Sequence, residues 1–239
     1  MEIIRVSQTA STNSLIKEIK AAHATVLVTD CQTAGRGQRG NSWEAEPGAN
    51  LTFSIMLKRS DLRADRQFIV SCAIALAIVE ALDDLLPLRD DITVKWPNDI
   101  YVGDKKICGI LIENSLTGAY VSSSIAGIGI NVNQICFLSD APNPVSMKQL
   151  TGMHYSLPDL LERICLRIIE RFELATDDVV CQYKCRLWRR EGFHRYIDVA
   201  SGKKFLARIA DVEPSGHLIL ETMEGQQRHY AFKEVTPVL

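Results

Sequence analysis

The sequence predicts an α+β fold with a largely antiparallel sheet, because hairpin signals lie beside long helical stretches without strict β–α–β alternation. The clearest hairpin joins residues 100–102 to residues 106–113 through Gly103 and Asp104, which favour a tight turn. The clearest helix spans residues 66–86 and ends at a proline. With 239 residues, 46% of them hydrophobic, the chain has enough apolar material for a sizeable core and one or two domains.

The other expected elements follow the same local rules. Residues 11–14 are all helix-capping types and precede a helical stretch at residues 15–20. Helical periodicity runs from residue 157 to residue 187. Four more strands are expected at residues 25–29, 51–57, 92–96 and 122–133. The second of these strands alternates as a strand with one covered face does, and the fourth is loosened by two glycines.

The pattern changes after residues 189–192, where short strands separated by glycine-containing turns begin. These strands are expected at residues 196–199, 205–212, 217–222 and 228–232. They indicate a small β-barrel of about forty-five residues, too small to be robust alone, which we expect to dock on the first domain. The expected domain boundaries are therefore 1–192 and 193–239.

Composition excludes several classes of protein. The formal net charge of −2 gives no global basic field for nucleic acid. The start of the chain lacks the features of a signal peptide, and its longest apolar run, residues 68–79, is too short to span a bilayer. The seven cysteines form no Cys-x-x-Cys and favour a reduced cytoplasmic protein with small buried thiols, Cys181 and Cys185 included. The five scattered histidines form no metal-binding pattern. We expect a soluble cytoplasmic protein with no DNA or membrane partner.

Residues 35–43 (Gly-Arg-Gly-Gln-Arg-Gly-Asn-Ser-Trp) are the most informative stretch for function. Glycines let backbone N–H groups approach a ligand, arginines bind phosphate or carboxylate oxygens, and Trp43 offers a flat face for a ring. The stretch matches the dinucleotide fingerprint in spacing and nearly matches a P-loop, but Pro47 and Gly48 exclude the helix that both require. The interpretation is a loop around a nucleotide-like ligand, and the alternative is a mobile surface turn.

Six short motifs occur in a fixed order along the chain. They are residues 11–13 (Ser-Thr-Asn), 32–40 (Gln-Thr-Ala-Gly-Arg-Gly-Gln-Arg-Gly), Trp43, 95–99 (Lys-Trp-Pro-Asn-Asp), 106–113 (Lys-Ile-Cys-Gly-Ile-Leu-Ile-Glu) and 127–131 (Gly-Ile-Gly-Ile-Asn). Their order and separations resemble those of the biotin protein ligases, over nearly the whole chain. Each motif alone is modest support, whereas the ordered set is strong.

The resemblance implies a catalytic domain similar to class II aminoacyl-tRNA synthetases, followed by a small SH3-like barrel. It implies that biotin is activated with ATP and Mg²⁺ to biotinyl-5′-AMP, and that biotin then passes to a lysine of a carboxylase's biotin carboxyl carrier domain. Family loops often carry arginine where this chain has Gln38. Some relatives carry a DNA-binding winged-helix domain before the first of these motifs. In this chain that motif begins at Ser11, so no such domain is expected. Some relatives dimerise through sheet edges, so a homodimer is possible.

The expected chemistry needs no enzyme nucleophile, only cations and backbone donors that hold two anions together. The resemblance selects Lys106 over Lys105, which the residues alone leave nearly tied. The expected catalytic residues are Arg36, Lys106 and Arg39. Small hydroxyl and amide groups match the ureido ring of biotin, although Ser11 to Asn13 are also common helix caps. The expected biotin-binding residues are Ser11, Thr12, Asn13, Gln32, Gly35, Arg36, Gly37, Gln38, Lys106 and Gly109.

For ATP, Trp43 is expected over the adenine, whereas Trp96 is expected in the core. Lys95 lies on an inner strand, where a charge is costly unless paired, so it is a candidate for a phosphate contact. The expected ATP-binding residues are Arg36, Arg39, Trp43, Lys95, Asn98, Lys106 and Asn131. Asp99 is the candidate to place Mg²⁺ or the acceptor lysine, with a turn-capping role as the alternative.

Two other functions stay open on these residues. Lipoate–protein ligase activity uses a similar fold and chemistry, and the arginine-rich loop together with residues 95–99 favours biotin. A non-catalytic biotin-sensing module would keep the pocket without turnover, and Arg36, Lys106 and Trp43 argue against it.

Overall fold

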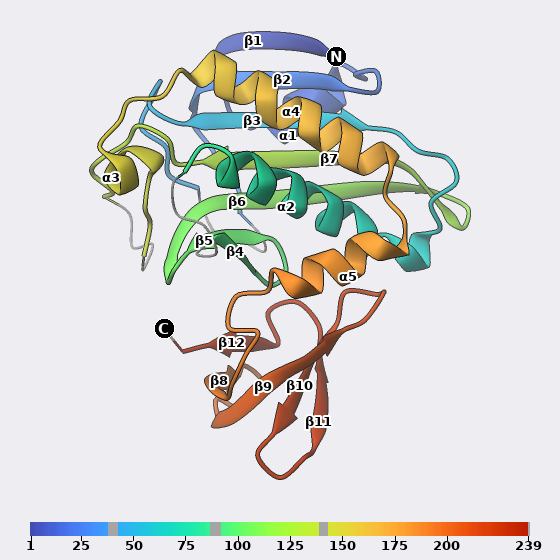
Figure 1. Ribbon diagram of the computed structural model, residues 1–239. Coiled ribbons are helices and arrows are strands. Elements are labelled where there is room, and N and C mark those ends of the chain that lie inside the picture. Colours follow the sequence, from blue (N-terminus) through green and yellow to red (C-terminus); the bar gives the residue numbers. More distant parts are fainter. Residues whose placement is uncertain (38–42, 87–91, 139–142, 239) are drawn as a thin grey trace.

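A seven-stranded sheet dominates the computed structural model, which describes residues 1–37, 43–86, 92–138 and 143–238 (Figure 1). Its strand order is β1-β2-β3-β7-β6-β5-β4. The strands are β1 (Glu2–Thr9), β2 (Thr25–Gln32), β3 (Leu51–Leu57), β4 (Ile92–Lys95), β5 (Asp99–Val102), β6 (Lys105–Thr117) and β7 (Tyr120–Ile130). Among the described strands of this sheet, β1 and β2 pair in parallel and the other neighbours pair antiparallel. The predicted hairpin forms between β5 and β6, where Gly103 has φ of +55°.

Helices cover both faces of this sheet. On one face lie α2 (Phe68–Asp83) and α4 (Leu157–Glu173), with α5 (Asp177–Cys185) packed against α2 (Figure 1). On the other face lies α1 (Thr12–Glu18), whose Ile16 packs with Leu27, Met56 and Ile125. Successive side chains of β2 point to opposite faces of the sheet. Val26 and Val28 join the core under α2 and α4, whereas Leu27 joins the cluster under α1.

The inner strand β3 differs from its prediction. All seven of its residues are buried, so the expectation of one covered face is wrong. The physical reason is that α1 covers one face of β3 while α4 lies over the other. The helix α2 is buried nearly all round, because its sequence is apolar from Phe68 to Val79 apart from Ser71.

A second, five-stranded antiparallel sheet follows α5, with strand order β11-β10-β9-β8-β12. Its strands are β8 (His194–Asp198), β9 (Lys204–Val212), β10 (Leu218–Thr222), β11 (Gln227–Tyr230) and β12 (Val235–Pro237). In the described part of the chain, β11 and β12 form the two edges and do not pair, so the sheet is not a closed barrel. The indole Nε1 of Trp96 donates to the Gly216 carbonyl at 2.9 Å, and its ring meets Phe232 edge-on. Trp96 therefore packs where the two sheets meet.

Some elements were not predicted from the sequence. They are the edge strand β1, the short helix α3 (Met147–Thr151) and the three-residue strand β12. The predicted burial of thiols is confirmed for Cys72 and Cys108 but wrong for Cys181 and Cys185, which are exposed on α5. That helix buries Val179 and Tyr183 instead. No helix in the described ranges is long and apolar enough to cross a bilayer.

Candidate functional site

A cleft of about 1080 Å³ opens on the α1 face of the large sheet and reaches the second sheet. The predicted site residues that line it are Ser11, Thr12, Asn13, Gln32, Arg36, Gly37, Trp43, Lys95, Asn98, Asp99, Lys106, Gly109 and Asn131. Gly35 lies beside the cleft, and its carbonyl accepts from Trp43 N–H at 3.2 Å. The predicted residues Gln38 and Arg39 lie outside the described residues. Segments far apart in sequence therefore meet in one space.

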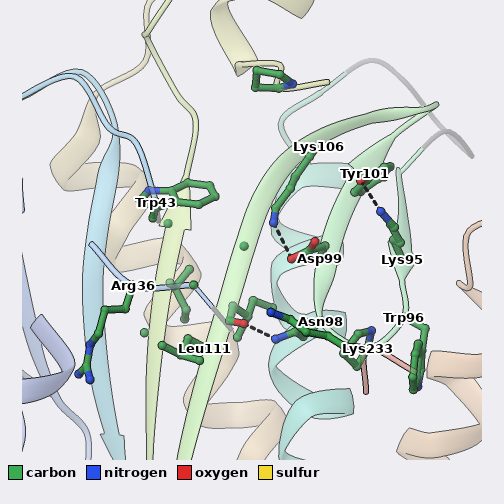
Figure 2. A pocket seen from close by; sticks show the side chains of 18 of the residues that line it. Arg36, Trp43, Lys95, Trp96, Asn98, Asp99, Tyr101, Lys106, Leu111 and Lys233 are labelled. Atoms are coloured by element: carbon green, nitrogen blue, oxygen red, sulfur yellow. Dashed lines mark hydrogen bonds and ion pairs between the residues drawn. The ribbon is translucent and has the colours of Figure 1, made fainter. Parts of the chain in front are cut away.

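Lys106 and Asp99 form an ion pair inside this cleft. Lys106 Nζ lies 2.8 Å from Asp99 Oδ1, and Figure 2 shows the two side chains pointing toward one another from neighbouring strands. Ile107 is an extra residue in β6, because Ile100 pairs with Cys108 and Tyr101 with Lys106. In a regular strand, residues three apart face opposite sides. The bulge at Ile107 brings Lys106 and Gly109 to the same cleft.

Arg36 approaches the cleft from the end of β2. Its guanidinium donates to Ser14 Oγ at 2.9 Å and to Ser11 Oγ at 3.5 Å. It points toward α1 and away from Lys106 (Figure 2). Two of the three predicted catalytic cations, Arg36 and Lys106, thus lie on different walls of one cleft, with space between them for a ligand that carries more than one anionic group.

The start of α1 forms the polar end of the cleft. Residues 11–14 were predicted to cap this helix, but the side chain of the N-cap residue Ser11 makes no capping hydrogen bond. Gln32 Oε1 instead accepts from the Thr12 N–H at 2.9 Å. Asn13 Nδ2 donates to Glu113 Oε2 at 2.7 Å, and Asn13 Oδ1 lies 2.6 Å from Ser54 Oγ. Thr12 and Asn13 are both 3% exposed. Their polar atoms are therefore held in fixed directions before any ligand arrives.

Trp43 packs flat against glycine backbone in the middle of the cleft. A Cβ on Gly129 would lie 2.3 Å from the indole, and one on Gly109 would lie 2.9 Å from it. Lys106 Nζ lies 5.6 Å from the ring centroid, within the range of a cation–π contact. The indole therefore fits against β6 and β7 because Gly109 and Gly129 have no side chains there. It lies beside the predicted catalytic lysine.

Lys95 is held by aromatic groups near the second sheet. Its Nζ donates to Tyr101 Oη at 2.9 Å and lies 4.9 Å from the Tyr101 ring and 5.7 Å from the Trp188 ring. Burial lowers the pKa of Lys95 below its usual value, and the nearby Asp99 carboxylate partly opposes that effect. A phosphate group would favour the charged form of this lysine.

Asn98 and Asn131, the two asparagines predicted for ATP binding, are buried in the cleft wall. Asn98 Nδ2 donates to the Ile110 carbonyl, and Asn131 Nδ2 donates to the Lys106 carbonyl at 3.5 Å. Asn131 Oδ1 is buried with no hydrogen-bond partner among the described residues. Both amides therefore brace the strand that carries Lys106, and Asn131 retains a free acceptor.

Residues 2–131 match the profile of the Biotin/lipoate A/B protein ligase family, which is more than half of the 239 residues. The chain belongs to the biotin/lipoate A/B protein ligase family. Its predicted enzyme class, a ligase, is confirmed.

Individual relatives agree with this assignment. The bifunctional ligase/repressor BirA of Bacillus subtilis is 29% identical over 235 residues, covering 95% of this chain and 70% of that protein. The biotin–[acetyl-CoA-carboxylase] ligase of Mycobacterium tuberculosis is 27% identical over 230 residues, covering 90% and 82%. The structure of Aquifex aeolicus biotin protein ligase in complex with biotin and ATP superposes with a TM-score of 0.78 at 24% identity, covering 99% of this chain and 98% of that one. The predicted α+β fold is confirmed.

Sequence reasoning did not assign several residues of the cleft of this family member. Gly127 and Gly129 line it, and their place inside a strand was a usable signal because glycine in a strand often marks close approach. Tyr101 and Trp188 reach it from β5 and from the segment after α5, and neither gives a local signal. Ser54 does not line the cleft, but it lies behind it on β3 and contacts both Thr12 and Asn13, which only the fold reveals.

Proposed function

We propose that this protein activates biotin with ATP to biotinyl-5′-AMP and then transfers biotin to a lysine of a biotin carboxyl carrier domain. The observation that carries the proposal is the placement of Arg36 and Lys106 on separate walls of one cleft of about 1080 Å³. The cleft has a polar end at α1 and an aromatic face at Trp43. These features match a ureido ring, a carboxylate and a nucleotide in one space. Because the reaction consumes ATP, a cytoplasmic location is part of the proposal.

The first step forms one bond and breaks one. A biotin carboxylate oxygen attacks the α-phosphorus of ATP, the bond to the β-phosphate bridging oxygen breaks, and pyrophosphate leaves. Negative charge accumulates on oxygens around the α-phosphorus, which Lys106 is placed to stabilise from the strand that also carries Gly109. Arg36 closes the other wall and holds the anions in place. No side chain of the protein becomes covalently bonded.

The second step transfers biotin to the carrier. The neutral amine of the acceptor lysine attacks the acyl carbon of the adenylate, the bond between that carbon and the phosphate oxygen breaks, and AMP leaves with release of one proton. Lys106 now stabilises the leaving phosphate. The same cation therefore serves both steps, while the start of α1 keeps hold of the ureido ring.

Mg²⁺ is expected with ATP, and Asp99 is the candidate carboxylate to place either this ion or the acceptor lysine. Asp99 Oδ1 is taken by Lys106 Nζ, and the described ranges contain no cluster of three histidine, cysteine or carboxylate side chains that fits a metal ion. These residues do not fit a metal held by the protein. We therefore derive no step through such a metal and treat Mg²⁺ as part of the MgATP substrate.

The test is pyrophosphate release from ATP with biotin or with lipoate as the acid. We expect pyrophosphate release with biotin. Faster release with lipoate than with biotin would instead identify a lipoate–protein ligase. Incubation with ATP, biotin and a carrier domain, followed by mass measurement of the carrier, tests the transfer step. Binding of biotin without pyrophosphate release would instead identify a biotin-sensing module.

A further inference from the structure

Ser54 occupies a buried position next to the polar end of the cleft. It lies on β3 between Leu27 of β2 and Gly127 of β7, and it is 0% exposed. Its Oγ lies 2.7 Å from Thr12 Oγ1 and 2.6 Å from Asn13 Oδ1. Ser54 is not among the residues that line the cleft, so it acts on a ligand only through these two neighbours.

The direction of each hydrogen bond in this group follows from acceptors that cannot donate. Asn13 Nδ2 lies 2.7 Å from the Glu113 carboxylate and 3.4 Å from the Leu111 carbonyl, and both groups only accept. The amide nitrogen of Asn13 must therefore face β6, and its oxygen must face Ser54. A Cβ on Gly127 would lie 2.4 Å from that oxygen, so the glycine makes room for this orientation.

The single hydroxyl proton of Ser54 then fixes the direction of the hydrogen bond between Ser54 and Thr12. Because Asn13 Oδ1 can only accept, Ser54 must donate its single proton to it. Ser54 Oγ, 2.7 Å away, is then an acceptor for the Thr12 hydroxyl. Gln32 Oε1 is a second acceptor for that hydroxyl at the longer distance of 3.2 Å, and it already accepts from the Thr12 N–H. The shorter contact favours donation to Ser54, which points the Thr12 proton away from the cleft. Thr12 Oγ1 is left with acceptor lone pairs for a ligand. Gln32 Oε1 accepts from Thr12 N–H, so the Nε2 group of Gln32 remains as the donor end.

The polar end of the cleft therefore presents an acceptor at Thr12 and a donor at Gln32. A cyclic urea carries N–H donors beside a carbonyl acceptor and matches this pattern, whereas the dithiolane ring of lipoate has neither group. We propose that Ser54 is a positioning residue that makes this site select a ring N–H, an inference that rests on the proposed function. Its hydroxyl does so by fixing the proton on Thr12, without touching the substrate.

The experiment measures pyrophosphate release with biotin and with the two cyclic-carbamate analogues, in which oxygen replaces one or the other ureido nitrogen. Ser54→Ala removes the acceptor of the Thr12 proton, which then turns toward Gln32 or the ligand. Ser124→Ala is the matched control, because Ser124 is also 0% exposed, lies on β7 of the same sheet and donates to Asn114 Oδ1 at 2.7 Å, but does not line the cleft. Each variant thus loses one buried hydroxyl of equal size.

The unmodified protein should prefer biotin to one carbamate by about 30-fold or more in kcat/KM. In Ser54→Ala we expect kcat/KM for biotin to fall about tenfold, the preference over that carbamate to shrink below about threefold, and the KM for ATP to stay within about twofold. Ser124→Ala should keep the full preference. If Ser54→Ala does not fold, Ser54→Cys serves, since its sulfur is a weak acceptor and the same loss of preference is expected.

An unchanged preference in the Ser54 variant, or an equal loss in Ser124→Ala, would overturn the inference while leaving biotin activation intact. Absence of biotin-dependent pyrophosphate release in the unmodified protein would instead overturn the proposed function, and the inference with it.

Discussion

Lys106 Nζ on β6 lies 2.8 Å from Asp99 Oδ1 on the neighbouring strand β5, beside the bulge at Ile107, with the two side chains 30% and 27% exposed. The pair holds a cation in the cleft at a defined position before any phosphate is present. A ligand with more negative charge than a single carboxylate can compete for the same ammonium. We therefore propose that the ion pair positions Lys106 for the α-phosphate.

Replacing Lys106 should stop adenylate formation without unfolding the protein. For Lys106→Met we expect biotin-dependent pyrophosphate release to fall about 10²–10³-fold, because one preorganised charge contact is lost from the transition state. The partly exposed Asp99 left behind should cost less than about 1 kcal/mol in unfolding free energy, which thermal denaturation checks. Lys105→Met is the matched control, since Lys105 is exposed and does not line the cleft. Near-normal turnover in Lys106→Met would remove this lysine from the mechanism.

Asp99→Asn separates positioning from metal binding. If Asp99 acts by holding Lys106, kcat should fall about tenfold while the Mg²⁺ concentration for half-maximal rate stays within about twofold. The measurement is a Mg²⁺ titration of pyrophosphate release at saturating biotin and ATP. A large rise in that Mg²⁺ concentration would show that Asp99 is a metal ligand after all.

Trp43→Ala should weaken ATP binding much more than biotin binding, by about 1–3 kcal/mol if the indole stacks on the adenine. Gly129→Ala should act in the same direction, because its Cβ would lie 2.3 Å from the indole and displace it. Calorimetry with each substrate separately makes the comparison. Equal weakening of biotin and ATP in both variants would assign Trp43 to folding.

Lys95 should make the free energy of unfolding depend on pH in the alkaline range. Its folded-state pKa is lowered by burial, so the unfolded chain binds this proton more tightly than the folded protein does. This lysine destabilises the fold below its folded-state pKa, and the penalty fades as pH rises toward the unfolded value near 10.4. Lys95→Met should therefore be more stable than the unmodified protein at pH 7, with the advantage shrinking by pH 10. Urea denaturation at both pH values measures it, and an advantage that grows with pH would contradict this account.

The sequence predicted elements whose signals are local. The boundaries of β3 were right at both ends, and Gly103 with Asp104 correctly marked the hairpin. The residues of β1 were not predicted as a strand. Ile3 and Ile4 are adjacent apolar residues, and they break the apolar–polar alternation that is typical of a strand with one covered face. Locally encoded turns and apolar runs were therefore read correctly, while an edge strand with an irregular pattern was not.

Most of the residues predicted for the site line one cleft, but their contacts with each other were not predicted from the sequence. The bulge at Ile107, which turns Lys106 toward Asp99, depends on strand pairing and has no local signature. Residues 11–14 were predicted as the capping residues of α1, whereas Gln32 from a different element accepts from the Thr12 N–H. Ser54 was predicted only as part of a strand with one covered face, and its two hydrogen-bond partners lie about forty residues away in sequence. Such long-range contacts can be assigned only from the fold.

The central claim, that Arg36 and Lys106 act together on a carboxylate and a nucleoside triphosphate, is tested most directly by biotin-dependent exchange of labelled pyrophosphate into ATP. The measurement compares the unmodified protein with Arg36→Met, Lys106→Met and the double variant. We predict exchange in the unmodified protein, a loss of about 10²-fold or more in each single variant, and a double variant little worse than either, because the two cations act as a unit. Exchange that persists in the double variant would contradict the account.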